Sequence, residues 1–177
     1  MTDFDFWKRQ YQDTWGRSSQ RETDIAEYLA HESGACIVPV GLGAGSTTFL
    51  PGPASSHGAS KGDADLMVKG TDIYLEVTGP LVQSVDHNQG LWVRPDKVEN
   101  ARQNMQSKET WVVHHLPKGD LIRVILLGEE FFQALKAGDF SIVSPRIRGN
   151  QEQYYEIPAT HRCVQPCNAL LERLGRK

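Results

Sequence analysis

The chain of 177 residues has little cysteine, no long apolar run and no excess of basic residues. Its three cysteines make an odd count, and its first seven residues are acidic and aromatic, unlike a signal or transit peptide. We therefore expect a cytoplasmic protein without a disulfide framework. The longest apolar runs, such as Val124 to Leu127, are far too short to span a bilayer, so no membrane partner is expected.

The net charge of −3 does not by itself indicate a protein that binds polyanions. Nucleic-acid binding depends instead on the local field along a groove. Five basic residues would supply such a field if the fold brought them together: Arg94, Lys97, Arg102, Arg146 and Arg148. Scattered, solvated charges explain the same residues equally well, so composition leaves both interpretations open.

Hydrophobic residues make up 39% of the chain and charged residues 23%, which is typical of a globular protein with one sizeable core. We expect a single domain over 1–177, with its core at about 20–157. A spacing of four between aromatic residues predicts a helix over 4–15 that Gly16 ends. Ser19 and Glu22 form a capping-box pattern at the start of a second helix that Gly34 ends.

Strands and helices then alternate along the rest of the chain. Short runs of apolar and β-branched residues predict strands over 36–40, 64–69, 72–78, 91–94, 111–115, 121–127, 140–146 and 154–157. Helices are predicted after Pro95, over 129–136 and over 168–174. This order indicates an α/β fold with a mixed sheet flanked by helices.

The two strands on either side of Gly70-Thr71 are the most informative part of the sequence. Glycine at the first position of a two-residue loop favours a type II′ hairpin, which places Lys69 opposite Asp72 and Asp65 opposite Glu76. Alternation then directs the apolar side chains of both strands to one face. Asp63, Asp65, Glu76 and Thr78 share the other face.

Carboxylates directly opposite one another destabilise a sheet unless a cation offsets their repulsion. A hard divalent ion, bound by carboxylates and waters, is the natural candidate. The alternative is a solvent-exposed hairpin on which the carboxylates point apart into water. A second set of metal-type residues, His161, Cys163 and Cys167, offers only three ligands and more often marks an ordinary loop-to-helix junction.

The run from Asp65 to Thr78 resembles the core signature of the PD-(D/E)xK nucleases, which are restriction-endonuclease-like. In that family an acid on one strand is followed, after a turn, by a hydrophobic strand that ends in Glu-x-Lys. The segment from Glu22 to Gly34 resembles the family's first helix, which often supplies a further acid. The resemblance covers about residues 20–127, and it implies a restriction-endonuclease-like mixed sheet.

The resemblance also implies roles for individual residues. Asp65 and Glu76 would bind Mg²⁺ or Mn²⁺, with the Val77 carbonyl and Asp63 as further ligands and Glu22 as an additional catalytic acid. Thr78 stands where the family has lysine, and threonine cannot supply a cation. Lys97 is our candidate substitute because it borders the apolar stripe of its helix, from which a long side chain can reach sideways.

The function that the resemblance implies is a magnesium-dependent endo- or exonuclease that hydrolyses phosphodiester bonds of nucleic acid, with DNA as the expected partner. Because Thr78 replaces the lysine, a catalytically inactive nuclease fold that serves as a nucleic-acid- or protein-binding module is the alternative. A homodimer or a partner subunit also stays open as the source of a missing group.

Overall fold

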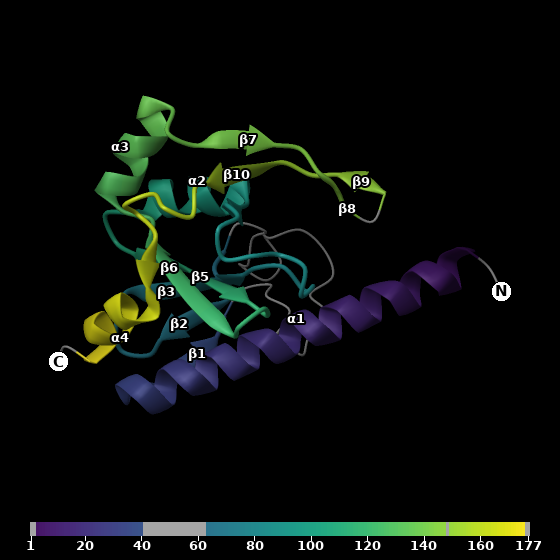
Figure 1. The fold of residues 1–177 in the computed structure, drawn as a ribbon. Coiled ribbons are helices and arrows are strands. Elements are labelled where there is room, and N and C mark those ends of the chain that lie inside the picture. Colours follow the sequence, from purple (N-terminus) through teal and green to yellow (C-terminus); the bar gives the residue numbers. More distant parts are fainter. Residues whose placement is uncertain (1–2, 41–62, 148, 176–177) are drawn as a thin grey trace.

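The computed structural model describes residues 3–40, 63–147 and 149–175. Its centre is a six-stranded sheet in the order β1-β2-β3-β5-β6-β11 (Figure 1). These strands are β1 (Ile37–Pro39), β2 (Leu66–Val68), β3 (Ile73–Thr78), β5 (Glu109–Leu116), β6 (Leu121–Leu126) and β11 (Gln165–Pro166). Strands β3 and β5 are parallel and the other pairs are antiparallel, so the sheet is mixed, as the sequence predicts.

A second, three-stranded sheet has the order β4-β10-β7, which the sequence did not separate from the first. Its strands are β4 (Leu91–Val93), β10 (Tyr154–Ile157) and β7 (Ser141–Val143). Next to it, β8 (Arg146–Ile147) and β9 (Asn150–Gln151) form a two-stranded ribbon. The predicted strand over 140–146 is therefore divided between β7 and β8.

Helices cover both faces of the six-stranded sheet. On one face lie α1 (Asp3–Ser33) and α4 (Cys167–Gly175). Their side chains Ile25, Leu29 and Leu170 join a buried cluster with the alternate residues of the strands. The sheet therefore contributes a largely apolar face to the layer formed by α1 and α4.

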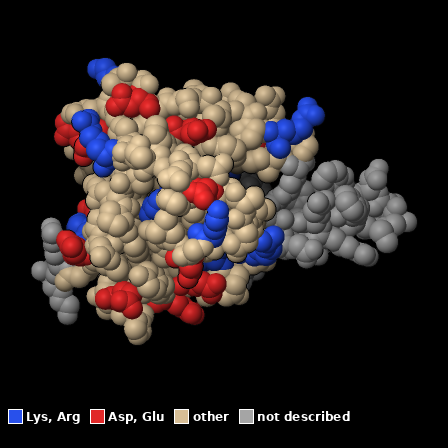
Figure 2. Space-filling model, in the orientation of Figure 1, with Lys and Arg blue, Asp and Glu red and all other residues tan. Residues whose placement is uncertain are grey.

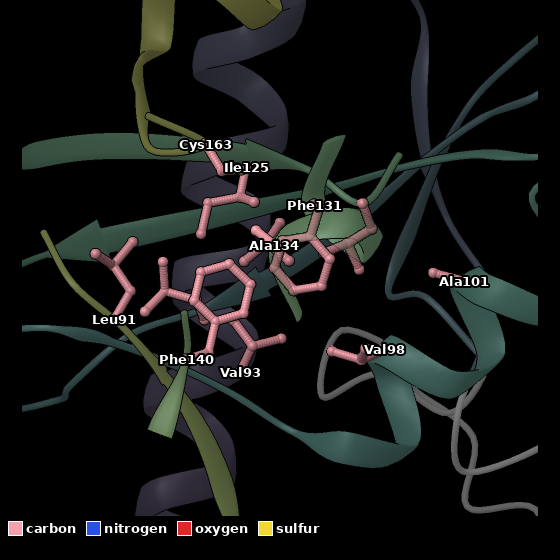
Figure 3. Packing of buried hydrophobic residues seen from close by; sticks show 12 residues of the cluster. Leu91, Val93, Val98, Ala101, Ile125, Phe131, Ala134, Phe140 and Cys163 are labelled. Carbon is pink, nitrogen blue, oxygen red and sulfur yellow. The ribbon is translucent and has the colours of Figure 1, made fainter. Parts of the chain in front are cut away.

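The opposite face of the sheet packs against α2 (Pro95–Asn104), α3 (Glu129–Ala137) and the three-stranded sheet. Figure 3 shows this cluster, which includes Val98 and Ala101 of α2, Phe131 of α3 and Ile125 of β6. Helix α2 is thus held against the sheet by its own apolar stripe. Across the described residues no helix is both long and apolar enough to cross a membrane.

The prediction of two N-terminal helices is wrong, because α1 runs without a break from Asp3 to Ser33. Gly16 and Ser19 both lie inside this helix, so Ser19 is not an N-cap, and its carbonyl accepts a hydrogen bond from the Thr23 hydroxyl. Glycine lowers helix stability by only about 1 kcal/mol, which packing of the helix on the sheet outweighs. The helix ends at Gly34, as expected, where φ is +71°.

The substitution Gly16→Ala tests this continuous helix. An added Cβ at Gly16 meets nothing within 4 Å, so alanine should stabilise the protein by up to about 1 kcal/mol in denaturant unfolding. Gly34→Ala is the matched control: its positive φ disfavours a side chain, and we expect a destabilisation of about 1 kcal/mol. If Gly16→Ala were as harmful as Gly34→Ala, the helix would be interrupted at Gly16.

Candidate metal and catalytic site

The hairpin between β2 and β3 has the register that the sequence predicts. Leu66 pairs with Leu75 and Met67 pairs with Tyr74, and the Asp65 amide donates to the Leu75 carbonyl at 3.1 Å. Extending this ladder by one residue puts Asp65 opposite Glu76. Leu66, Leu75 and Val77 are buried on the α1 side, as expected, so the two carboxylates lie on the side of α2.

The turn itself differs from the prediction. Thr71 donates its amide to the Val68 carbonyl, so Lys69 and Gly70 form the centre of the turn in place of Gly70-Thr71. The Thr71 hydroxyl adds bonds to the Val68 carbonyl and the Ile73 amide. The ladder therefore ends at Met67 and Tyr74, and Lys69 and Asp72 are not a paired position, although the overall register is unchanged.

Both carboxylates are buried rather than splayed into water. Asp65 is 6% exposed and Glu76 is 7% exposed. Asp65 Oδ2 accepts a hydrogen bond from the Val77 amide at 2.8 Å, which fixes the direction of this carboxylate. A solvated hairpin face, the alternative interpretation of the sequence, is therefore excluded.

Lys97 reaches both acids from the first turn of α2. Its Nζ lies 2.7 Å from Glu76 Oε2 and 3.7 Å from Asp65 Oδ1, and it donates to the Asp63 carbonyl at 2.5 Å. A cation in the first turn opposes the helix dipole, so this placement depends on the acids that receive it. Lys97 is thus a buried ion-pair partner and not a solvated lysine at a helix start.

The protonation equilibria of this cluster are strongly perturbed. Burial, and then the neighbouring Asp65, raise the pKa of Glu76 well above its usual value. Burial also raises the pKa of Asp65, against the opposing effects of Lys97 and the Val77 amide. Burial lowers the pKa of Lys97, but the two carboxylates outweigh it and the net shift is upward. One ammonium is therefore insufficient to neutralise two buried carboxylates.

A divalent cation fits this arrangement. Glu76 Oε2 is fully buried, and although Lys97 Nζ is close, no described group donates a well-directed hydrogen bond to it. Mg²⁺ typically takes one or two carboxylates and completes its octahedron with waters and phosphate oxygens. Asp65 and Glu76 offer the hard, anionic oxygens that such an ion prefers.

Asp63 and Glu22 lie apart from this pair of acids. The Asp63 carboxylate is directed towards the Asn100 amide, 3.3 Å away on α2. Within residues 3–40, 63–147 and 149–175, no three or more His, Cys, Asp or Glu side chains form a metal-type cluster, and this includes His161, Cys163 and Cys167. Glu22 is buried on α1, on the other face of the sheet, where it lines a small cavity with Pro39 and Leu66.

Thr78, at the position of the family's lysine, follows Glu76 on the same face of β3 and pairs with His114 of β5. Its side chain borders a cavity rather than the Asp65–Glu76 pair. Sequence reasoning missed His114 as a neighbour of the site, because pairing between β3 and β5 is non-local. Of the basic patch, Arg94 and Arg102 pair with Asp96 and Glu99, and Arg148 lies outside the described residues.

The surface charge is mixed. On the face shown in Figure 2, lysines and arginines are interspersed with acids, and much of the surface is uncharged. This distribution agrees with the small net charge and gives no broad field of one sign on this face. Interaction with a polyanion at this face would therefore depend on short-range contacts.

Comparison with known proteins finds similarity in structure only. No protein-family model matches the chain, and no curated protein matches it in sequence. A nuclease from a fusselovirus has a similar structure, with a TM-score of 0.54 and 12% identity over 90% of this chain and 89% of that one. A Holliday junction resolvase from the archaeal hyperthermophile Archaeoglobus fulgidus matches with a TM-score of 0.46 and 15% identity, over 86% of this chain and 98% of that one. The mixed sheet flanked by helices is thus the expected restriction-endonuclease-like α/β fold.

Proposed function

We propose that this protein is a metal-dependent nuclease that hydrolyses phosphodiester bonds in DNA. The observation that carries the proposal is the buried cluster of Asp65, Glu76 and Lys97, with the lysine supplied by α2. The cluster contains the two acids and the one cation that the family signature requires, although the cation comes from a different position in the sequence. A partner subunit is then not needed to supply the lysine that is absent from position 78.

Asp65, Glu76 and the Val77 carbonyl would hold Mg²⁺ or Mn²⁺. When bound, such an ion polarises a phosphoryl oxygen and lowers the pKa of a water molecule. The Val77 amide fixes Asp65 for this role through its bond to Oδ2. Glu22, buried beside Leu66 on the other face of the sheet, stays a predicted additional acid.

Lys97 would stabilise negative charge on the scissile phosphate. A preorganised cation acts most strongly where water is excluded, and the Lys97 side chain is only 11% exposed. The Asp63 carbonyl anchors the ammonium, while Asn100 holds the Asp63 side chain. With Asp65 and Glu76 engaged in metal binding, the Lys97 ammonium would be free to turn from Glu76 to an incoming phosphate.

Metal binding should appear as thermal stabilisation. At a concentration 100 times Kd, Mg²⁺ or Mn²⁺ should add about 2.7 kcal/mol, which raises Tm by roughly 5–10 °C in a domain of this size. Asp65→Asn and Glu76→Gln should each abolish this shift. Glu99→Gln, an exposed acid on α2, is the control and should keep it. An unchanged response in both site variants would show that the ion binds elsewhere.

Nuclease activity should depend on Lys97. We expect Lys97→Ala to lower kcat by about 10²–10³-fold on plasmid and oligonucleotide DNA, because a donor to the phosphate is lost. Arg102→Ala removes an exposed cation from the same helix and should leave kcat unchanged. Full activity in Lys97→Ala would remove this residue from the mechanism and leave Lys61, outside the described residues, to be tested.

Lys97→Ala should also unfold at a lower temperature than the parent protein. Removing one partner of a buried ion pair typically destabilises a protein by about 3–5 kcal/mol. Because Mg²⁺ would neutralise the same acids, its stabilising effect should be larger in Lys97→Ala than in the parent protein. Thermal melts with and without Mg²⁺ measure this difference, and an equal shift in both proteins would contradict it.

The binding-module alternative is tested in the same assays. A purified protein that binds DNA but never nicks it, with Mg²⁺ or with Mn²⁺, would favour an inactive nuclease fold. In that case Asp65, Glu76 and Lys97 would be a structural ion-pair cluster.

A further inference from the structure

A cavity of about 750 Å³ begins at Thr78, immediately beyond the two acids. One wall is the loop at 79–90, which connects β3 to β4. A second wall is the outer face of the three-stranded sheet, with Trp92, Tyr154 and Glu156. His114 of β5 lies beside Thr78 at the base.

The cavity and the carboxylates belong to one continuous surface. Glu76 and Thr78 are alternate residues of β3, so their side chains leave the same face of the sheet about 7 Å apart. This is the distance between neighbouring side chains on one face of a strand. A nucleotide with its phosphate at Asp65 and Glu76 therefore lies within reach of the cavity.

The wall formed by the small sheet is aromatic. Trp92 and Tyr154 stack with ring centroids 5.6 Å apart and an interplanar angle of 28°. Trp92 is nonetheless 38% exposed, which is unusual for the largest apolar side chain. An indole ring supported by a tyrosine offers the flat surface on which nucleic-acid bases stack.

The polar groups of the cavity suit a neutral ligand. No lysine or arginine is found among its lining residues in the described part of the chain, so this part of the lining offers no cation to a phosphate. Glu156 accepts a hydrogen bond from the Trp92 indole at 3.1 Å and is an acceptor for an amino group. His114 is neutral, because burial, and then Arg123, lower its pKa to about 3.

The walls are held in place from outside the cavity. Arg21 of α1 donates to the Gly79 and Pro80 carbonyls, and Arg123 donates to the His87 carbonyl at 2.8 Å. At the end of the loop, a Cβ added to Gly90 would lie 2.7 Å from Glu156 Cγ. The loop thus packs directly against the small sheet, and the cavity is formed before any ligand binds, which reduces the entropic loss on binding.

We propose that this cavity receives an unstacked nucleobase of the DNA whose phosphate lies at Asp65 and Glu76. This inference rests on the proposed nuclease function and specifies its substrate class. Extruding a base requires a few kcal/mol, and least for a base that is already unpaired. The protein therefore selects DNA with a bulged, mismatched or single-stranded nucleotide over a perfect duplex.

The test compares two duplexes that differ only at one bulged position, which carries adenine in one and an abasic sugar in the other. Binding is measured with the full chain in Ca²⁺, a hard ion that the same oxygen ligands accept. Loss of an aromatic stacking partner weakens binding by roughly 5- to 150-fold per base. The adenine duplex should bind more tightly by a factor in this range.

Variants assign the preference to the cavity. Trp92→Ala should bind both duplexes equally, and Trp92→Phe, which keeps a ring and guards against misfolding, should retain part of the preference. Ile142→Ala is the control, since Ile142 is an exposed apolar residue on β7 of the same small sheet and does not line the cavity. It should retain the whole preference.

The outcomes separate this inference from the proposed function. If the parent protein binds or cuts DNA but treats the two duplexes alike, or if Trp92→Ala keeps the preference, the base pocket is wrong and the nuclease proposal stands. If the protein neither binds nor cuts any DNA, both proposals are overturned.

Discussion

Electrostatic repulsion between Asp65 and Glu76 is the constraint on which the candidate site depends. Two carboxylates face each other across a hairpin and are nearly excluded from water. Burial raises the pKa of both carboxyl groups, Asp65 raises that of Glu76 further, and Lys97 opposes both shifts. Replacement of the three side chains by apolar ones would often be neutral or stabilising, so a buried cluster of this kind is weak evidence for a structural role. Under the proposed function, the cluster serves metal binding and catalysis instead.

An apolar layer packs on each face of the six-stranded sheet that carries this cluster. Leu66, Leu75 and Val77 fill the core under α1, so their neighbours in the strands are directed to the opposite face. There α2 packs through Val98 and Ala101, which brings the preceding turn and Lys97 over the hairpin. The same strand then continues to Thr78 and the cavity behind it, so one alternation of side chains positions the acids and the pocket together.

The register of the hairpin, the burial of one face and the class of fold were predictable because they depend on local patterns. Alternation of apolar residues between positions 65 and 78 is a signal of period two, and it specifies which side chains share a face. The turn was less predictable: Thr71 caps it through its hydroxyl, which moves the turn by one residue without changing the register. The prediction that Gly16 ends a helix was wrong because the sequence does not distinguish a glycine inside a packed helix from a glycine at a helix end.

Local sequence patterns are enough to place Asp65 opposite Glu76, to put Lys97 at the border of an apolar stripe, and to show that Thr78 cannot supply a cation. Tertiary packing alone brings Lys97 Nζ within 2.7 Å of Glu76, separates the small sheet from the large one, and places Trp92 and His114 around the cavity that Thr78 borders. The residues brought together in this way are 14 or more positions apart in the sequence. Such contacts follow from how helices and sheets pack, and no local spacing of residues encodes them.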